Sequence, residues 1–104
     1  TLEMELGMSE SVINTLGWRG TDQGAQVKSS PEDEPSWNGT NTSGFSGLPG
    51  GDRWINGTFY FGSGYLWTSS SFGANAWLRG LQHAGILRTA FGKSAGLSIR
   101  CIKN

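Results

Sequence analysis

The first 28 residues space their apolar positions differently from the rest of the chain. The apolar side chains there recur at intervals that one face of a helix would collect, namely Leu2, Leu6, Val12, Ile13 and Leu16. Gly7 interrupts the pattern and Ser9 is a good N-cap, so we expect two short helices, the second ending at Gly17. A weaker helical pattern runs from Thr21 to Lys28. Residues 1–28 therefore predict a helical part.

Residues 29–44 predict an exposed connection. Ser, Pro, Asn, Gly and acidic residues dominate this stretch, and water and local turns satisfy the backbone of such a segment. From residue 45 to residue 104 the apolar runs are short and are cut by Gly every few positions, which is typical of strands and tight turns. The expected strands are residues 45–48, 58–61, 65–71, 76–82, 87–91 and 97–102.

Two local signals refine this β-rich part. The pair Asn56-Gly57 predicts a hairpin with a type I′ turn, because both central residues of that turn need a positive φ. In the last run, Leu97, Ile99 and Cys101 alternate with more polar residues and share one face. We therefore expect Cys101 to point inward.

Together these patterns predict a single α+β domain, in which short N-terminal helices precede a twisted antiparallel sheet of short strands with long irregular loops. The chain has 104 residues, enough for one core. We expect that core to include Leu48, Trp67, Leu78, Leu97 and Ile99. We expect Glu32, Asp33, Glu34 and Lys103 to be exposed.

Charge and hydropathy exclude two classes of partner. The formal net charge is zero, so the chain lacks the basic excess of a nucleic-acid-binding protein. No apolar run approaches the roughly 18 residues of a membrane-spanning helix, and no signal peptide is recognisable, so we expect no membrane insertion. The neutral total conceals a balance of −5 in residues 1–35 and +5 in the remainder. We interpret the acidic third as a solvated face.

The residues that usually carry catalysis are scarce. One histidine and one cysteine occur, without metal-ligand spacing, so we expect no metal and no cofactor. His83 lies in a turn-like segment and is expected to be an exposed loop residue, while Cys101 is either a small buried hydrophobe or a thiol whose partner lies elsewhere. We interpret the acidic run 32–34 as solvated rather than as a calcium site, and the serines 69–71 as hydrogen-bonding strand residues. The domain is therefore not expected to be an enzyme.

Aromatic density is the most informative feature. Eight aromatic residues fall between Trp54 and Trp77, among Gly, Ser and Asn. They would either fill a β core or form a recognition surface. The Asn56-Gly57 hairpin would bring an aromatic ring, a guanidinium and an amide together, a combination that suits carbohydrate or protein ligands. The candidate ligand-binding residues are Arg53, Trp54, Asn56 and Tyr60.

Four motifs resemble the Fibrobacter succinogenes major paralogous domain. They are residues 17–24 (GWRGTDQG), 40–53 (TNTSGFSGLPGGDR), 67–71 (WTSSS) and 96–101 (GLSIRC). The resemblance implies an irregular α+β fold related to the C-type-lectin and formylglycine-generating-enzyme scaffold. It also implies an extracellular or cell-surface location in a bacterium, with binding or adhesion rather than catalysis.

In that family these motifs form the second half of the domain, so the resemblance implies a shortened version in which Cys101 lacks its usual partner. Surface left bare by the missing half would favour a homodimer with an interface of at least roughly 1,000 Å². Three functions stay open: a recognition module, a self-associating assembly domain and, least favoured, an enzyme of the formylglycine-generating type. A single cysteine argues against the last, because that oxidation chemistry needs a pair.

Overall fold

The computed structural model describes residues 1–101, and it confirms the α+β class. All helices of this part precede residue 28, and all strands but one follow residue 51. The elements are, in chain order, α1 (Leu2–Glu5), α2 (Glu10–Ile13), β1 (Gly17–Arg19), α3 (Gln23–Val27), β2 (Asp52–Arg53), β3 (Phe59–Tyr60), β4 (Tyr65–Phe72), β5 (Asn75–Gly80), β6 (Ile86–Gly92) and β7 (Gly96–Leu97).

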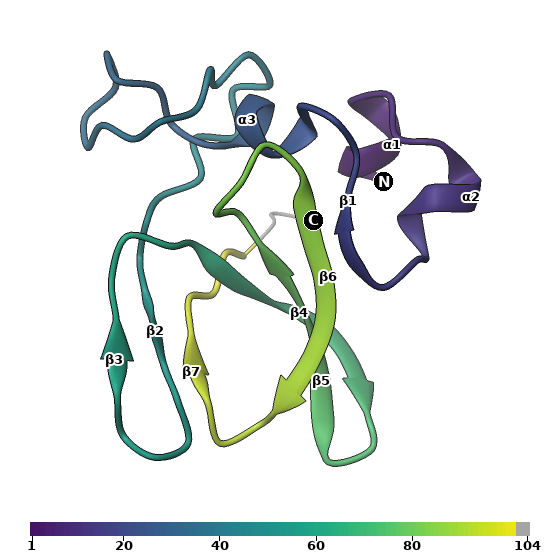
Figure 1. Cartoon of the computed structure of the whole chain (residues 1–104), viewed down its shortest axis with the longest axis vertical. Helices are drawn as coiled ribbons and strands as arrows, with labels where there is room; N and C mark the ends of the chain where they lie inside the picture. Colours follow the sequence, from purple (N-terminus) through teal and green to yellow (C-terminus); the bar gives the residue numbers. More distant parts are fainter. Residues whose placement is uncertain (102–104) are drawn as a thin grey trace.

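The strands form two antiparallel sheets (Figure 1). One has four strands in the order β1-β6-β5-β4, and the other has three in the order β3-β2-β7. Strands β4, β5 and β6 follow one another as hairpins, as their short Gly-bounded runs predict. Strand β1 pairs with β6 and so places a strand inside the part that the sequence predicts to be helical. This strand carries no periodic signal, because it has only three residues.

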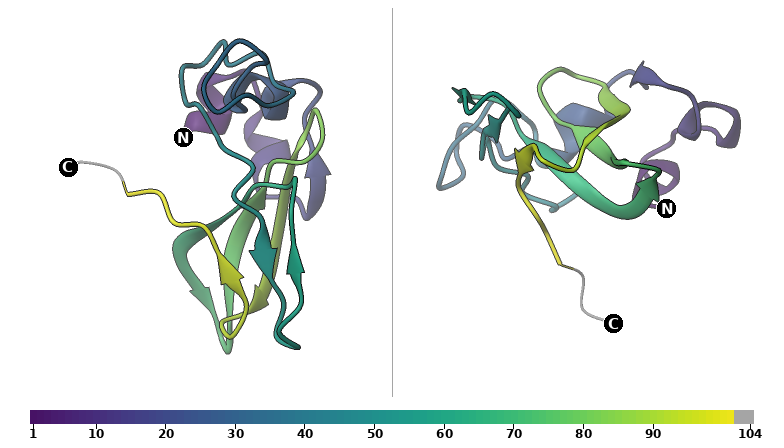
Figure 2. Two further views of the ribbon diagram at one scale, coloured as in Figure 1. Left: turned by 90° about the vertical axis from the view of Figure 1, so that its left-hand side faces the viewer. Right: turned by 90° about the horizontal axis from the view of Figure 1, so that it is seen from below.

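The helices and the long connection gather at one end of the molecule, and the strands extend toward the other (Figures 1 and 2). The hydrophobic core at the helical end consists of Val27, Leu81 and Ile86. Partly buried side chains from distant parts of the chain pack against it, namely Leu6, Trp37, Phe45 and Leu66. The core therefore joins α1, α3, the long connection and the four-stranded sheet.

The predicted core residues divide into three groups. Leu78 is confirmed, since it is 0% exposed, whereas Trp67 and Leu97 are only half-buried. Leu48 is 49% exposed and Ile99 is 74% exposed, so both predictions were wrong. Leu48 lies in a tight turn in which the Gly50 amide donates to the Leu48 carbonyl, and Ile99 follows the end of β7. Neither side chain is held by a sheet.

Other expected elements are shorter in the structure. The second helix ends at Ile13 rather than at Gly17, because β1 begins there, and residues 45–48 form no strand beyond a single bridge of Gly47 to Lys28. The last strand stops at Leu97, after which the chain leads away from the body of the molecule (Figure 2). Cys101 is exposed in this segment, so the expectation that it points inward was wrong.

The connection 29–44 is docked on α3 rather than merely solvated. The Thr40 amide donates to the Ala25 carbonyl at 2.8 Å, and the Ser43 amide to the Gln26 carbonyl at 3.1 Å. Glu32 and Glu34 are exposed as predicted. Asp33 is half-buried, contrary to the prediction, because its carboxylate accepts the Ser30 amide at 2.6 Å and the Asn41 amide at 3.0 Å. Lys103 lies outside the described residues.

A methyl group at Gly24 is expected to destabilise the domain. A Cβ there would overlap the carbonyl oxygens of Gly85 and Ala84, because α3 packs directly on the turn between β5 and β6. Gly24→Ala should lower the free energy of unfolding by about 1–3 kcal/mol, the range for overpacked sites. Gly92→Ala is the matched control, since the nearest atom to a Cβ there is 3.9 Å away. Equal urea midpoints for the two variants would contradict this packing.

Candidate functional site

Residues 52–61 form a hairpin, here called the aromatic hairpin, that carries all four predicted binding residues. Asp52 pairs with Tyr60 and Arg53 pairs with Phe59. The hairpin is confirmed, but its turn is not type I′, because only Gly57 has a positive φ, +87°. The Gly57 amide donates to the Trp54 carbonyl and the Trp54 amide to the Thr58 carbonyl, both at 2.9 Å. This is the three-residue loop that ends in a left-handed glycine.

The hairpin divides the four residues between its two faces. Paired strand residues share a face and neighbours alternate, so Arg53 lies with Phe59 on one face, while Asp52 and Tyr60 lie on the other. Asn56 lies in the loop, where its side-chain oxygen accepts the Thr58 amide at 3.0 Å. The structure therefore brings Trp54 and Tyr60 together, but it does not place Arg53 on their face.

Trp54 anchors the hairpin to the four-stranded sheet. Its ring centroid lies 4.8 Å from that of Phe91 on β6 and 6.1 Å from that of Tyr60, the latter in an edge-on geometry. Trp54 is half-buried, whereas Tyr60 is exposed. Aromatic pairs at these distances stabilise a structure beyond their buried area. The indole is therefore held in place before any ligand arrives.

The opposite face forms an open platform. The Arg53 guanidinium lies 5.9 Å from the centre of the Phe59 ring, within reach of a cation–π interaction. On the other side of Arg53, strand β7 presents Gly96, which has no side chain. Among residues 1–101, no carboxylate pairs with Arg53. The guanidinium is thus oriented by an aromatic ring and free to donate hydrogen bonds.

Sequence reasoning missed how much apolar surface the hairpin exposes. Phe61 is 86% exposed, and Ile55 and Phe59 are also mainly exposed. Large exposed apolar side chains gathered on one element are informative, because isolated ones are ordinary. The signal was present as the run Phe59-Tyr60-Phe61, in which consecutive aromatics cannot all face one side of a strand.

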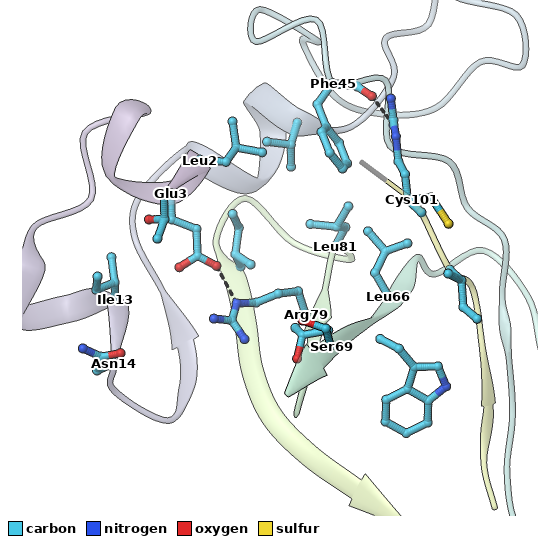
Figure 3. Close-up of a pocket in the computed structure, with 17 residues that line it drawn as sticks. Leu2, Glu3, Ile13, Asn14, Phe45, Leu66, Ser69, Arg79, Leu81 and Cys101 are labelled. Carbon is cyan, nitrogen blue, oxygen red and sulfur yellow. Dashed lines mark hydrogen bonds and ion pairs between the residues drawn. The ribbon is translucent and has the colours of Figure 1, made fainter. Parts of the chain in front are cut away.

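Apart from the aromatic hairpin, the domain has an open groove of about 860 Å³ beside α1 and the C-terminal segment (Figure 3). Apolar side chains form most of its wall, among them Leu2, Ile13, Leu66 and Leu81. Cys101 and Ser69 also line it, and so do Arg100 and Phe45, of which the Arg100 guanidinium donates to the Phe45 carbonyl. Cys101 and Ser69 thus both lie on this groove, whereas His83 is not among the residues that line it.

Glu3 lies at the groove and forms an ion-pair cluster. Its carboxylate accepts hydrogen bonds from Arg19 at 2.8 Å and from Arg79 at 2.6 Å. Burial raises the pKa of Glu3, but the hydrogen bonds and charges of Arg19 and Arg79 outweigh it and hold that pKa below the ordinary value. The cluster joins α1, β1 and β5.

The remaining candidate residues are apart from these features. His83 is exposed, as expected, in the turn between β5 and β6, where its ring lies edge-on to Trp18 with centroids 4.5 Å apart. In the described part of the chain, no three His, Cys, Asp or Glu side chains come together as a metal site would require. Likewise, within residues 1–101 no helix has the length and apolar content needed to cross a membrane.

The geometry thus defines a small α+β domain with an exposed aromatic hairpin. The family model for the Fibrobacter succinogenes major domain matches residues 1–103, so the chain belongs to this family. Neither the curated proteins nor the solved structures gave a significant match.

Several motif residues on which the resemblance rests hold the fold rather than a ligand. In residues 17–24, Arg19 pairs with Glu3, and Gln23 accepts the Thr21 amide at 2.8 Å while donating to the Leu6 carbonyl at 3.3 Å. In residues 40–53, Asn41 donates to the Ser46 hydroxyl at 2.9 Å and accepts the Ser46 amide at 2.9 Å. These contacts fix the conformation of loops, which the spacing of apolar residues does not predict.

Proposed function

We propose that this domain is a non-catalytic recognition or adhesion module that binds carbohydrate through the aromatic hairpin, outside the cell or at the surface of a bacterium. The observation that carries the proposal is the exposure of Phe59, Tyr60 and Phe61 beside Arg53, which has no carboxylate partner within residues 1–101. An apolar surface with a few oriented polar groups is typical of ligand sites.

The chemistry of a sugar fits this surface. The apolar face of a pyranose ring stacks on an aromatic ring, and its hydroxyl oxygens accept hydrogen bonds from a guanidinium, which has five N–H donors. Phe59 and Arg53 supply these two functions on one face. Tyr60 and the anchored Trp54 supply a second aromatic surface on the other. The absence of a side chain at Gly96 leaves the first face accessible.

The resemblance contributes the rest of the proposal. It supplies the C-type-lectin-like fold and the extracellular location, and it makes a protein ligand the alternative to carbohydrate. The homodimer stays a prediction. Exposed apolar residues on the hairpin and on α1 would suit an assembly domain, and light scattering at high micromolar concentration measures whether the mass exceeds 11.2 kDa.

Loss of the platform is expected to abolish sugar binding. The domain should bind at least one member of a panel of gluco-, xylo- and chito-oligosaccharides, and Phe59→Ala or Arg53→Ala should weaken that binding by at least about tenfold, because each removes one half of the stacking and hydrogen-bonding pair. Tyr60→Ala and Trp54→Ala test the second face in the same way. Isothermal titration calorimetry measures all four affinities.

Phe72→Ala is the matched control, because Phe72 is an exposed aromatic residue at the end of β4, outside the hairpin. It should bind like the wild type. Trp54→Ala also removes packing on Phe91, so the thermal unfolding of this variant is measured as well. Phe59 and Arg53 are exposed, so replacing either by alanine should leave the stability of the domain unchanged. Absence of binding across the panel, or equal loss in Phe72→Ala, would overturn the carbohydrate proposal.

A further inference from the structure

A smaller cavity adjoins the groove on the same face of the four-stranded sheet, and Asn14, Thr68 and Arg79 line both. It has a volume of about 270 Å³ and is lined by Asn14, Thr68, Ser70, Trp77, Arg79 and Arg88. We call it the arginine notch. Trp77, Arg79 and Arg88 share one face of β5 and β6, because Arg79 pairs directly with Arg88 and side chains alternate. Phe91, on which Trp54 packs, falls on the opposite face, so the notch is separate from the aromatic hairpin.

The notch holds more positive charge than the chain neutralises. Two arginines directly opposite each other across an antiparallel pair repel. Glu3 pairs with both Arg79 and Arg19, so its single negative charge already faces two positive charges. Arg88 adds a third positive charge. Within residues 1–101, Arg88 has no carboxylate partner. The charges of Arg79 and Arg19 add to burial, the largest cause, in lowering the pKa of Arg88.

The unpaired guanidinium is nevertheless held in place. The central carbon of the Arg88 guanidinium lies over the Trp77 ring, 4.0 Å from its centre, and Nη1 donates to the Asn14 carbonyl at 2.8 Å. Stacking on an aromatic ring orients the planar fork of an arginine without using up all of its donors. An anion that enters the notch therefore meets a donor group that needs little reorganisation.

An irregularity in strand β4 supplies hydroxyl groups at the same place. The register between β4 and β5 shifts between Trp67 and Ser71, so residues 68–70 lie opposite Trp77 alone. The Thr68 hydroxyl donates to the Trp77 carbonyl at 3.0 Å and so supplies a hydrogen bond that a backbone amide of β4 would supply in a regular ladder. Ser70 lies at the cavity and is exposed. Bulges of this kind often redirect side chains beside functional sites.

We propose that the arginine notch binds the carboxylate group of a small acidic ligand, with the Arg88 and Arg79 guanidiniums and the Ser70 hydroxyl as hydrogen-bond donors. A planar carboxylate matches the parallel N–H groups of a guanidinium. No acidic side chain lines the cavity. Arg79 already donates from Nε to Glu3 and from Nη1 to the Leu78 carbonyl, and Arg88 donates from Nη1 to the Asn14 carbonyl, so Nη2 of each arginine and Nε of Arg88 are the donors left for a ligand. The volume corresponds to about nine water molecules, which admits a small organic acid or one acidic sugar unit.

The proposal is tested by nuclear magnetic resonance titration of the full chain with sodium galacturonate, with galactose and sodium chloride as controls at matched ionic strength. Galactose differs by the absence of the carboxylate, so a response of the hairpin to sugar is separated from a response of the notch. We expect saturable shifts of the Trp77 indole and Arg88 Nε–H signals with galacturonate and not with galactose. Equal shifts with chloride would overturn the proposal.

Three variants assign the response to the notch. Arg88→Gln should weaken galacturonate binding by at least about tenfold, since hydrogen bonds to charged groups are lost. Arg88→Lys keeps the charge but removes the planar fork, so it should restore only part of the affinity. Lys93→Gln removes an equal charge at an exposed position that belongs neither to the notch nor to the aromatic hairpin, and it should leave these shifts unchanged. An equal effect of Lys93→Gln would show general charge attraction instead.

Sulfate and phosphate form the last arm of the test. If either displaces galacturonate at a lower concentration than acetate does, the assignment to a carboxylate is wrong. Arg88→Gln relieves the repulsion from Arg79 but loses the stacking on Trp77, so thermal unfolding of each variant is recorded first. Ser70→Ala is a second variant of the notch, and because Ser70 is exposed its replacement should leave the stability of the domain unchanged.

Discussion

Replacing Glu3 by glutamine is expected to lower the free energy of unfolding by about 3–5 kcal/mol, the range for breaking a buried ion pair. The carboxylate is the common partner of Arg19 and Arg79, and the Arg19 side chain is only 2% exposed. The Nε of Arg19 already has no acceptor among the described residues, so a neutral residue 3 would leave a buried guanidinium poorly compensated. Urea unfolding followed by tryptophan fluorescence measures the change.

Glu5→Gln is the matched control for this experiment. Glu5 belongs to the same helix α1 but is exposed and forms no ion pair within residues 1–101, so its replacement should change stability by less than about 0.5 kcal/mol. Similar losses in the two variants would mean that the acidic charge of α1 matters in general. The contacts of Glu3 with Arg19 and Arg79 would then contribute no more to stability than an exposed charge on the same helix.

The same cluster predicts how stability depends on pH. The folded-state pKa of Glu3 lies below its ordinary value of 4.5, which the unfolded chain adopts. The stabilisation is therefore fully present above the unfolded pKa and is lost as the pH falls through the folded pKa. The difference in unfolding free energy between the wild type and Glu3→Gln should accordingly be largest at neutral pH and shrink in acid. A constant difference between neutral pH and pH 3 would contradict this account.

Truncating Leu78 to alanine is expected to cost about 2–5 kcal/mol, as for other fully buried leucines. Leu78 lies in the middle of β5, paired with Trp67 on β4 and with Thr89 on β6, and it is 0% exposed. Ordered strands on both sides leave little freedom to close the cavity that the missing atoms would create. The urea midpoint should fall while the slope of the transition stays constant.

Leu48→Ala is the control for this experiment. The sequence pattern predicts both Leu48 and Leu78 to be core residues, whereas the structure buries only Leu78. Leu48 lies in an exposed turn, and its truncation should change stability by no more than about 0.5 kcal/mol. A loss at Leu48 as large as that at Leu78 would show that this turn is covered in solution, for example by a second chain.

Local sequence signals were sufficient for much of the fold. Strands β4, β5 and β6 follow from short apolar runs bounded by glycine, and the aromatic hairpin follows from Asn56-Gly57, because turn geometry depends on a few adjacent residues. The faces of the hairpin were not predicted. Nominating Arg53 with Trp54 overlooked that consecutive strand residues point to opposite sides.

What the sequence by itself determined is the class of the domain, the confinement of the helices to the first 28 residues, the buried Leu78 and the family. The tertiary structure alone decided that β1 pairs with β6, that Glu3 neutralises Arg79 from 76 positions away, and that Arg79 and Arg88 face each other in the notch. The physical reason is range. Turns and alternation depend on neighbours in the chain, whereas the partner of a charge or of a three-residue strand is chosen by segments that only folding brings together.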